Sequence, residues 1–275
     1  MPPRLRRRRA APRRQPGRRA RRGPHAHHRP AAPNGARLGH GPQAGALMPG
    51  ATTSGALNRA VHRYRSAPLG ARLFVHGRAF LSDLAFVERF VPRNGFVVDL
   101  GCGHGLFACL LRESSDNRRV LGIDLDPRKI EVARGAVRDT QWLRFEVGDV
   151  VADPPPKCDV VTIVDVLYLL PFEQQERVLR NAASALGEGG PVVVKAQERR
   201  TDPRYAITYL QETITVSLGF TRGGRERFFF PTREEALAMF ERAGFVVEVE
   251  DMPNRPYTDV VYLARKAPMK TSAVS

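Results

Sequence analysis

The sequence predicts an α/β fold, a doubly wound and mostly parallel seven-stranded sheet whose last strand runs antiparallel. Between residues 96 and 195, apolar runs of strand length alternate with amphipathic helical segments, which is typical of a parallel sheet covered by helices on both faces. A glycine-rich turn follows the first of these runs. Only five residues separate the last two apolar runs, too few for a crossover helix and enough for a hairpin, so the final strand is expected to be antiparallel.

The elements follow from periodicity and from helix start and stop signals. A helical region is expected over Ala56–Val91, before the first strand. Seven strands are then expected at Phe96–Leu100, Arg119–Asp124, Trp142–Val147, Cys158–Val164, Pro191–Lys195, Phe245–Asp251 and Tyr257–Arg265. Four helices are expected between them, at Gly105–Arg112, Pro127–Arg138 with Asp126 as its cap, Pro171–Leu186 and Thr232–Ala243.

The 275 residues are expected to divide into one folded domain with extensions. Residues 1–47 are expected to be disordered, 48–91 to form an N-terminal helical cap, 92–265 to form the main domain, and 266–275 to be a disordered tail. Residues 196–231 form an insertion rich in aromatic residues, which carries Arg222, Arg225, Arg227 and then Phe228-Phe229-Phe230. Most of these aromatic side chains are expected to pack as core.

The formal net charge of +16 is unevenly distributed along the chain. Residues 1–47 hold 13 Arg and no Lys, Asp or Glu, which leaves 31 basic and 28 acidic residues in the remainder. The predicted domain is therefore nearly neutral. Because nucleic-acid binding requires positive charge on the folded face that meets the phosphates, nucleic acid is not the expected partner.

Residues 1–47 are composed mainly of Arg, Ala, Pro and Gly, which account for 36 of the 47. Such a segment has too little apolar surface to offset the entropy of ordering it. It is a basic arm, an organellar transit peptide, or a stretch upstream of a true start at Met48. We favour the third interpretation, because all four residue types have GC-rich codons and the segment is neither Ser-rich nor amphipathic.

Other features of the sequence favour a cytoplasmic protein. No run approaches the ~20 apolar residues of a membrane span, and no apolar segment follows the N-terminal arginines. Cys102, Cys109 and Cys158 have neither zinc-site nor disulfide-framework spacing, so they are expected to be small buried thiols, and no metal is expected.

One motif gives the strongest indication of which ligand this chain binds. After the strand Val97-Val98, the pattern D-x-G-x-G-x-G places an acid at Asp99 and glycines at Gly101, Gly103 and Gly105. Glycine can adopt positive φ and lets the backbone approach an adenosyl or nucleotide group closely. The dinucleotide motif would require a third glycine at position 106, where this chain has leucine, which disfavours a nicotinamide oxidoreductase.

Asp124 supports an adenosine-containing ligand. It lies 19 residues after Gly105, at the end of the second predicted strand. A doubly wound fold places a carboxylate there to bind the ribose hydroxyls. Asp126 is available to cap the following helix, so Asp124 is available to bind the ligand.

These motifs, together with D-V-L-Y-L-L-P-F-E-Q-Q-E at 165–176, resemble uncharacterised bacterial class I S-adenosylmethionine-dependent methyltransferases. The resemblance covers residues 90–265 and implies a Rossmann-like methyltransferase fold with S-adenosylmethionine as cofactor. It places Asp149 at the adenine amine, with a simple turn as the alternative, and Asp165 near the cofactor's ammonium group. The implied cofactor-binding residues are Asp99, Gly101, Cys102, Gly103, Gly105, Asp124, Leu125, Asp149, Val150 and Asp165.

The expected reaction is methyl transfer to a small acceptor, apolar or lipid-like. His104, Tyr168 and Asp165 are candidate catalytic residues, although a structural role outweighs a catalytic one for each. An Asn/Asp-Pro-Pro-Tyr motif, common in enzymes that methylate base or glutamine amines, is missing after the fourth strand. The alternatives are an RNA methyltransferase that uses the basic arm and a non-catalytic cofactor-binding protein. Peripheral membrane contact through the arginines of the insertion also stays open.

Overall fold

The computed structural model describes residues 51–200, 228–252 and 258–268, with side chains from Ser54 onward. In this part of the chain, seven strands form one sheet in the order β3-β2-β1-β4-β5-β7-β6. The strands are β1 (Gly95–Leu100), β2 (Arg118–Asp124), β3 (Leu143–Val147), β4 (Val160–Val164), β5 (Pro191–Gln197), β6 (Phe245–Asp251) and β7 (Asp259–Lys266).

The direction of the strands is as predicted. Strands β1 to β5 pair in parallel. Strand β7 is antiparallel to both of its neighbours, β5 and β6. The hairpin inferred from a five-residue connection is therefore confirmed, and it inserts β7 between β5 and the edge strand β6.

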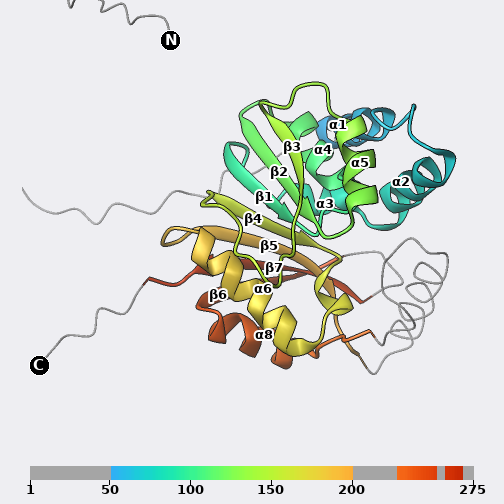
Figure 1. The fold of residues 1–275 in the computed structure, drawn as a ribbon. Coiled ribbons are helices and arrows are strands. Elements are labelled where there is room, and N and C mark those ends of the chain that lie inside the picture. The colour runs from blue at the N-terminus through green and yellow to red at the C-terminus, as the bar shows by residue number, and fades with distance from the viewer. Residues whose placement is uncertain (1–50, 201–227, 253–257, 269–275) are drawn as a thin grey trace, which may run out of the picture. The chain divides into compact units, whose positions relative to one another are not determined.

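Helices cover both faces of the sheet (Figure 1). One face packs against α1 (Ala51–His62), α2 (Leu69–Leu81), α3 (Leu84–Glu88), α4 (Leu106–Ser114) and α5 (Pro127–Gly135). The other packs against α6 (Phe172–Ala185) and α8 (Arg233–Arg242), and the 3-10 turn η1 (Leu167–Leu169) follows β4. Successive residues of a strand point to opposite faces, so Val97 joins the first core and Val98 the second.

The helix caps match the sequence signals. The Asp126 side chain accepts a hydrogen bond from the Arg128 amide at the start of α5. Thr232 and Glu235 form a capping box at the start of α8. Each device satisfies backbone amides that have no partner inside the helix.

A buried ion pair joins helix α3 to strand β2 of the sheet. Glu88, at the end of α3, lies 2.7 Å from the guanidinium of Arg118 at the start of β2, and both side chains are fully buried. Arg118 also donates hydrogen bonds to the carbonyls of Pro92 and Leu111 and to the Ser114 hydroxyl. These partners satisfy the Arg118 guanidinium, whereas Glu88 Oε2 is buried without a hydrogen-bond partner among the described residues and lies 3.7 Å from Arg93 Nη2.

Several predicted boundaries differ from the observed ones. Strand β5 continues through Ala196 and Gln197, which the prediction assigned to the insertion, because β7 supplies pairing partners at Val260 and Asp259. The helical region before β1 starts earlier, at Ala51, and consists of three helices. It breaks before Pro68, whose ring disfavours helix in the preceding residue, and again at Asp83, which has a φ of 44°.

Smaller shifts affect the other elements. Gly105 is the N-cap of α4 and α5 ends at Gly135, while β3 begins at Leu143 and β4 at Val160. The predictions for residues 1–47, for Arg222, Arg225 and Arg227 in the insertion, and for residues 269–275 lie outside the described residues.

Among the described residues, no helix has the length and apolar character that crossing a membrane requires. The three cysteines are free thiols. Cys109 is buried as expected, whereas Cys102 and Cys158 are half-buried.

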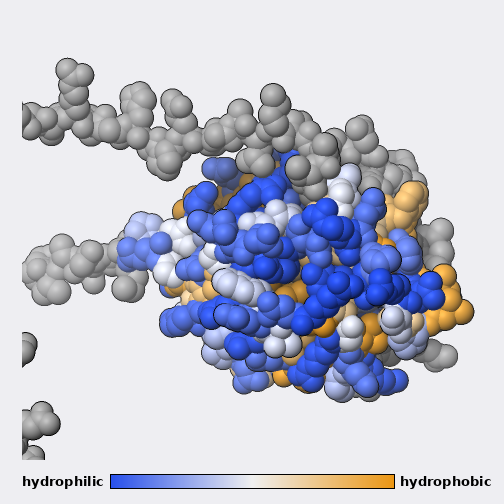
Figure 2. Space-filling model, turned by 90° about the horizontal axis from the view of Figure 1, so that it is seen from above, coloured by the Kyte–Doolittle hydropathy of each residue, from blue (hydrophilic) through white to orange (hydrophobic). Residues whose placement is uncertain are grey.

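The visible face in Figure 2 is mostly hydrophilic, with hydrophobic groups gathered at its right edge, the side on which α2 lies in Figure 1. Helix α2 exposes three large apolar side chains, those of Leu69, Leu73 and Phe80.

Candidate functional site

The sheet has a topological switch point between β1 and β4. These strands are neighbours, and the strand order runs outward from them in opposite directions. In open α/β sheets, ligands bind at the carboxyl ends of the strands where the order reverses. The glycine turn follows β1 and the segment beginning at Asp165 follows β4, so the structure brings two of the predicted motifs to this crevice.

The glycine turn is held against the end of β2. The amides of Gly101 and Cys102 donate to the Ile123 carbonyl at 2.8 and 3.0 Å. The Gly103 amide donates to Asp124 Oδ2 at 2.8 Å. Backbone hydrogen bonds therefore fix the turn beside the carboxylate that the sequence assigns to the ribose.

The three glycines have positive φ but different surroundings. A Cβ on Gly101 would collide with Val166, and one on Gly105 would lie 2.5 Å from the Phe145 ring. At Gly103, with a φ of 57°, no described atom lies within 4 Å of the Cβ position. Protein packing thus requires Gly101 and Gly105, whereas Gly103 faces open space.

Asp124 is half-buried and each carboxylate oxygen accepts one backbone hydrogen bond. Oδ2 binds the Gly103 amide, and Oδ1 accepts from the Asp126 amide at 2.9 Å. Ionised carboxylate oxygens have about four acceptor positions in all, so acceptor capacity is left for ligand hydroxyls. The neighbouring Leu125 is exposed.

Asp99 is buried at the end of β1. Its Oδ1 accepts a hydrogen bond from the Thr162 hydroxyl at 2.7 Å, and its Oδ2 has no hydrogen-bond partner among the described residues. Burial raises the pKa of Asp99 to about 7, against the lowering effects of the Thr162 hydrogen bond and of Arg78.

Asp149 and Val150 lie after β3, on the other side of Asp124. The Asp149 carboxylate accepts hydrogen bonds from the amides of Val151 and Ala152 at 2.9 and 3.2 Å. This is the turn that the sequence offers as the alternative role of Asp149, and both Asp149 and Val150 remain half-buried.

Asp165 lies in a buried ionic network. Its Oδ1 is 2.6 Å from Lys195 Nζ, which also lies 2.9 Å from Asp259 Oδ2. Its Oδ2 is 3.2 Å from the guanidinium of Arg78. Although burial opposes ionisation, Lys195 and Arg78 lower the pKa of Asp165 below its usual value. Its φ of 57° is unusual for a residue with a side chain.

His104 is half-buried inside the glycine turn. Its ring lies 4.8 Å from the Phe74 ring of α2, and its Nδ1 is buried with no hydrogen-bond partner among the described residues. Its carbonyl accepts a hydrogen bond from the Tyr64 hydroxyl at 2.6 Å. Burial, followed by the nearby Lys129, lowers the pKa of His104 to about 4, so the ring is neutral at physiological pH.

Tyr168 belongs to an aromatic cluster in the segment that follows β4. Its ring stacks on Phe230 at 5.2 Å and lies 6.0 Å from Phe228. The Phe229 amide donates to the Tyr168 carbonyl at 2.9 Å. Phe230 is buried, as expected for the aromatic part of the insertion, and the cluster buries Tyr168 as well.

Residues 97–190 match a family model described as a methyltransferase domain. The match contains the glycine turn, Asp124 and Asp165, and the strand order is that of the doubly wound methyltransferase fold. Residues 97–190 therefore form a methyltransferase domain with the class I fold. The cofactor that the sequence predicts for such a domain is S-adenosylmethionine.

Similar proteins agree with the methyltransferase assignment. The tetracenomycin polyketide synthesis 8-O-methyl transferase TcmO of Streptomyces glaucescens is 27% identical over 54% of this chain and 43% of its own. Demethylspheroidene O-methyltransferase of Rhodobacter capsulatus is 29% identical over 62% of this chain and 41% of its own. The chain thus spans about two fifths of the length of these curated relatives.

A solved structure shows the same fold. Magnesium protoporphyrin IX methyltransferase from Synechocystis PCC 6803, with bound S-adenosylhomocysteine, superposes with a TM-score of 0.54 at 16% identity. The match covers 78% of this chain and 96% of the other.

The methyltransferase cofactor fits the residues present at the switch point. Gly103 leaves open space, and Asp99 Oδ2 and His104 Nδ1 are buried polar atoms without a hydrogen-bond partner among the described residues. Buried polar groups normally find a partner, so such atoms beside an open turn are consistent with a ligand that completes them.

Sequence reasoning missed four polar residues that surround Asp165. Lys195, Gln197 and Asp259 are buried around Asp165, and Arg78 reaches it from α2. A lysine within the apolar run of β5 was a visible signal, because lysine is rarely buried without a partner. Arg78 carries no such signal, since its helix is placed only by tertiary packing.

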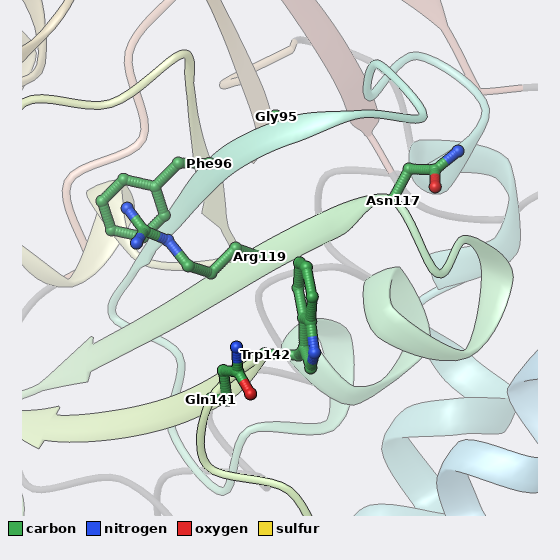
Figure 3. A pocket seen from close by; sticks show the side chains of 6 residues that line it. All are labelled: Gly95, Phe96, Asn117, Arg119, Gln141 and Trp142. Atoms are coloured by element: carbon green, nitrogen blue, oxygen red, sulfur yellow. The ribbon is translucent and has the colours of Figure 1, made fainter.

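A surface pocket of about 400 Å³ lies at the opposite end of the strands from the glycine turn (Figure 3). It is lined by residues at the amino ends of β1, β2 and β3, and the Arg119 guanidinium stacks on the Phe96 ring at 4.0 Å. The switch point lies at the carboxyl ends of the strands, so this pocket is separate from it.

Proposed function

We propose that this protein transfers the methyl group of S-adenosylmethionine to a small apolar or lipid-like acceptor. The observation that carries the proposal is the glycine turn at the switch point, where Gly103 faces open space beside the Asp124 carboxylate. That arrangement suits an adenosyl group, and the family match supports a methyltransferase rather than another nucleoside-binding protein.

The proposed cofactor contacts begin with the nucleoside. Asp124 would bind the ribose hydroxyls and Asp149 the adenine amine. The cofactor supplies a methyl carbon activated by a sulfonium charge, so the protein has to align the acceptor and exclude water. The backbone and side chains that would surround the cofactor are those of Asp99, Gly101, Cys102, Gly103, Gly105, Leu125, Val150 and Asp165.

The candidate catalytic residues differ in what they can do. Asp165 is ion-paired with Lys195 and has a lowered pKa, which makes it a poor general base. Tyr168 is enclosed by aromatic rings. His104 is neutral and can accept a hydrogen bond from an acceptor hydroxyl, but a pKa of about 4 means that it holds a proton weakly. Alignment is therefore expected to contribute more than base catalysis.

The acceptor class is supported by chemistry and by relatives. The aromatic cluster of Tyr168, Phe228 and Phe230 lies at the segment that follows β4, and the half-buried Phe228 leaves some apolar surface there. The names of two matched relatives, TcmO and demethylspheroidene O-methyltransferase, describe O-methyl transfer. We therefore favour an apolar acceptor with a hydroxyl group.

A transfer assay with methyl-labelled cofactor tests this function. The full chain is incubated with lipid extract, small phenols, total RNA or protein extract, and Gly103→Ala serves as the inactive control. Label is expected in the lipid or phenol fraction only. Label confined to RNA or protein would contradict the acceptor class. Binding of S-adenosylhomocysteine without transfer to any fraction would instead favour a non-catalytic role.

A further inference from the structure

We propose that the outward side of helix α2 docks on an anionic lipid bilayer. This side, the α2 face, consists of Leu69, Leu73, His76 and Phe80. The inference deepens the proposed function and rests on it in one respect, because it names a membrane as the source of a lipid-like acceptor.

Helix α2 presents apolar side chains to solvent as well as to the core. Its inward side carries the fully buried Val75. On the opposite side, Leu69, Leu73 and Phe80 are 67%, 62% and 77% exposed. With 3.6 residues per turn, these three positions and His76 fall within roughly 60° around the helix axis. A surface helix normally has polar residues on its outward side, and exposed apolar patches mark sites that contact a membrane or another protein.

The α2 face lies at one edge of the folded domain. Helix α2 is on the right in Figure 1, and the hydrophobic groups in Figure 2 gather at the corresponding edge. Each of its three apolar side chains is more than half exposed, so these side chains protrude instead of lining a groove. Protruding leucine and phenylalanine side chains can enter the boundary between lipid headgroups and acyl chains, as in amphipathic helices that lie on a membrane.

The charges around the α2 face suit an anionic membrane. Residues 48–82 contain five Arg and no Lys, Asp or Glu. Three of these arginines are paired with carboxylates of later elements. The other two, Arg65 and Arg72, are exposed and pair with no carboxylate among the described residues. Unpaired cations beside exposed leucines are typical of helices that bind anionic lipid.

The inward side of α2 connects the proposed membrane contact to the crevice. The Phe74 ring lies 4.8 Å from the His104 ring in the glycine turn. Arg78 donates a hydrogen bond to the Val164 carbonyl at the end of β4, at 3.1 Å. A bilayer on the outward side would therefore lie one helix diameter, about 10–12 Å, from the switch point. A lipid-like acceptor would then reach the methyl donor without leaving the neighbourhood of the membrane.

Flotation of the full chain with lipid vesicles tests the α2 face. Vesicles of phosphatidylcholine are compared with vesicles of phosphatidylcholine and phosphatidylglycerol in equal amounts, without methyl donor or acceptor. Wild type is expected to prefer the anionic vesicles at moderate salt. Leu69→Ser and Leu73→Ser are each expected to lower the partition coefficient about tenfold, because each removes a leucine side chain from the apolar boundary. Arg72→Gln is expected to lower it about fivefold on anionic vesicles and not at all on neutral ones.

Val246→Ser is the matched control. Val246 is 66% exposed on the edge strand β6, which lies away from α2 in Figure 1. Its substitution is expected to change vesicle binding less than about twofold. The arginines of residues 1–47 are present in every variant, and salt screens their attraction to anionic lipid but not the contribution of the leucines.

The outcomes separate the membrane from another occupant and from the function itself. No vesicle binding by wild type, no preference for anionic vesicles, or equal binding by wild type and Leu73→Ser would overturn the proposal. The competing occupant is a second copy of the chain. A wild-type dimer that Leu73→Ser converts to a monomer, measured by light scattering without vesicles, would overturn lipid docking in favour of that copy. Vesicle binding in the expected order, without methyl transfer to any fraction, would support the docking surface and contradict the proposed function.

Discussion

The glycines of the turn are expected to have different roles: Gly101 and Gly105 in packing, and Gly103 in ligand binding. Gly101 and Gly105 are enclosed by Val166 and Phe145, whereas Gly103 has open space at its Cβ position. The same residue type in one motif therefore serves two purposes. A substitution at each position is expected to affect a different property of the protein.

Gly103→Ala is expected to abolish most cofactor binding at a small cost in stability. The new methyl group would occupy the space proposed for the cofactor. Alanine at the positive φ of position 103 costs ~1–2 kcal/mol. Gly105→Ala is expected to cost more, because its Cβ collides with Phe145 and Ala133. Urea unfolding and titration with S-adenosylhomocysteine measure the two effects. Wild-type affinity in Gly103→Ala would show that the turn does not face the cofactor.

Asp99 is expected to make stability depend on pH. Because burial raises its pKa to about 7, the folded protein binds more protons than the unfolded chain between about pH 4 and 7. The free energy of unfolding contributed by Asp99 therefore falls as pH rises through this window. His104 acts in the opposite direction, since its lowered pKa of about 4 makes stability fall as pH drops below its ordinary value of about 6.5.

Comparison with Asp99→Asn isolates the Asp99 effect. The variant keeps the His104 contribution but cannot ionise at position 99. Its stability relative to wild type is expected to improve by a few kcal/mol between pH 4.5 and 8, at ~1.4 kcal/mol per pKa unit. Urea unfolding curves at several pH values measure the difference. A difference that stays constant with pH would mean that Asp99 is not protonated in the folded state.

At the scale of elements, the N-terminal helices belong to the folded core. Val75 of α2 and Leu84 and Val87 of α3 are fully buried within the core on one face of the sheet. The Glu88–Arg118 pair then joins α3 to β2. Because α2 carries both Phe74 and Arg78, anything that loosens this attachment is expected to disturb the cofactor crevice.

Removing one partner of this buried pair is expected to destabilise the protein strongly. Glu88→Gln leaves the buried Arg118 charge uncompensated, a loss of ~3–5 kcal/mol. Asp116→Asn removes the partner of the exposed pair with Arg112 and is expected to cost less than ~0.5 kcal/mol. Thermal and urea unfolding compare the two. Similar small losses in both variants would show that the buried pair does not anchor α3.

At the scale of the whole molecule, most of the net positive charge lies in residues 1–47, whereas the proposed cofactor-binding residues lie between 99 and 165. Residues 1–47 carry 13 of the 44 basic residues, and the remainder has 31 basic and 28 acidic residues. The proposed small-molecule reaction needs none of the N-terminal arginines.

A chain that starts at Met48 is expected to bind S-adenosylhomocysteine within about twofold of the full chain, at low and at moderate salt. The physical reason is that the site's charges are paired within the domain, as between Lys195 and Asp165. Transfer to the acceptor is also expected to be unchanged. Loss of transfer in the shortened chain, together with a strong salt dependence in the full chain, would favour a nucleic-acid acceptor that uses the arginines.

The sequence by itself determined the strand and helix order, the closing hairpin, the glycine turn and the register of Asp124. These depend on periodicity, loop length and turn chemistry, which act over a few residues. Even so, the end of β5 was misplaced, because Ala196 and Gln197 extend the strand only through pairing with β7.

Only the tertiary structure decided which side chains meet. It distinguished open Gly103 from enclosed Gly105, brought Lys195 and Asp259 to Asp165, and carried Arg78 from a distant helix to the end of β4. Such contacts join residues far apart in the chain and depend on how helices pack on the sheet. No local pattern encodes that packing, so the glycine turn and its position beside Asp124 could be predicted from the sequence, whereas the buried ionic network around Asp165 could not.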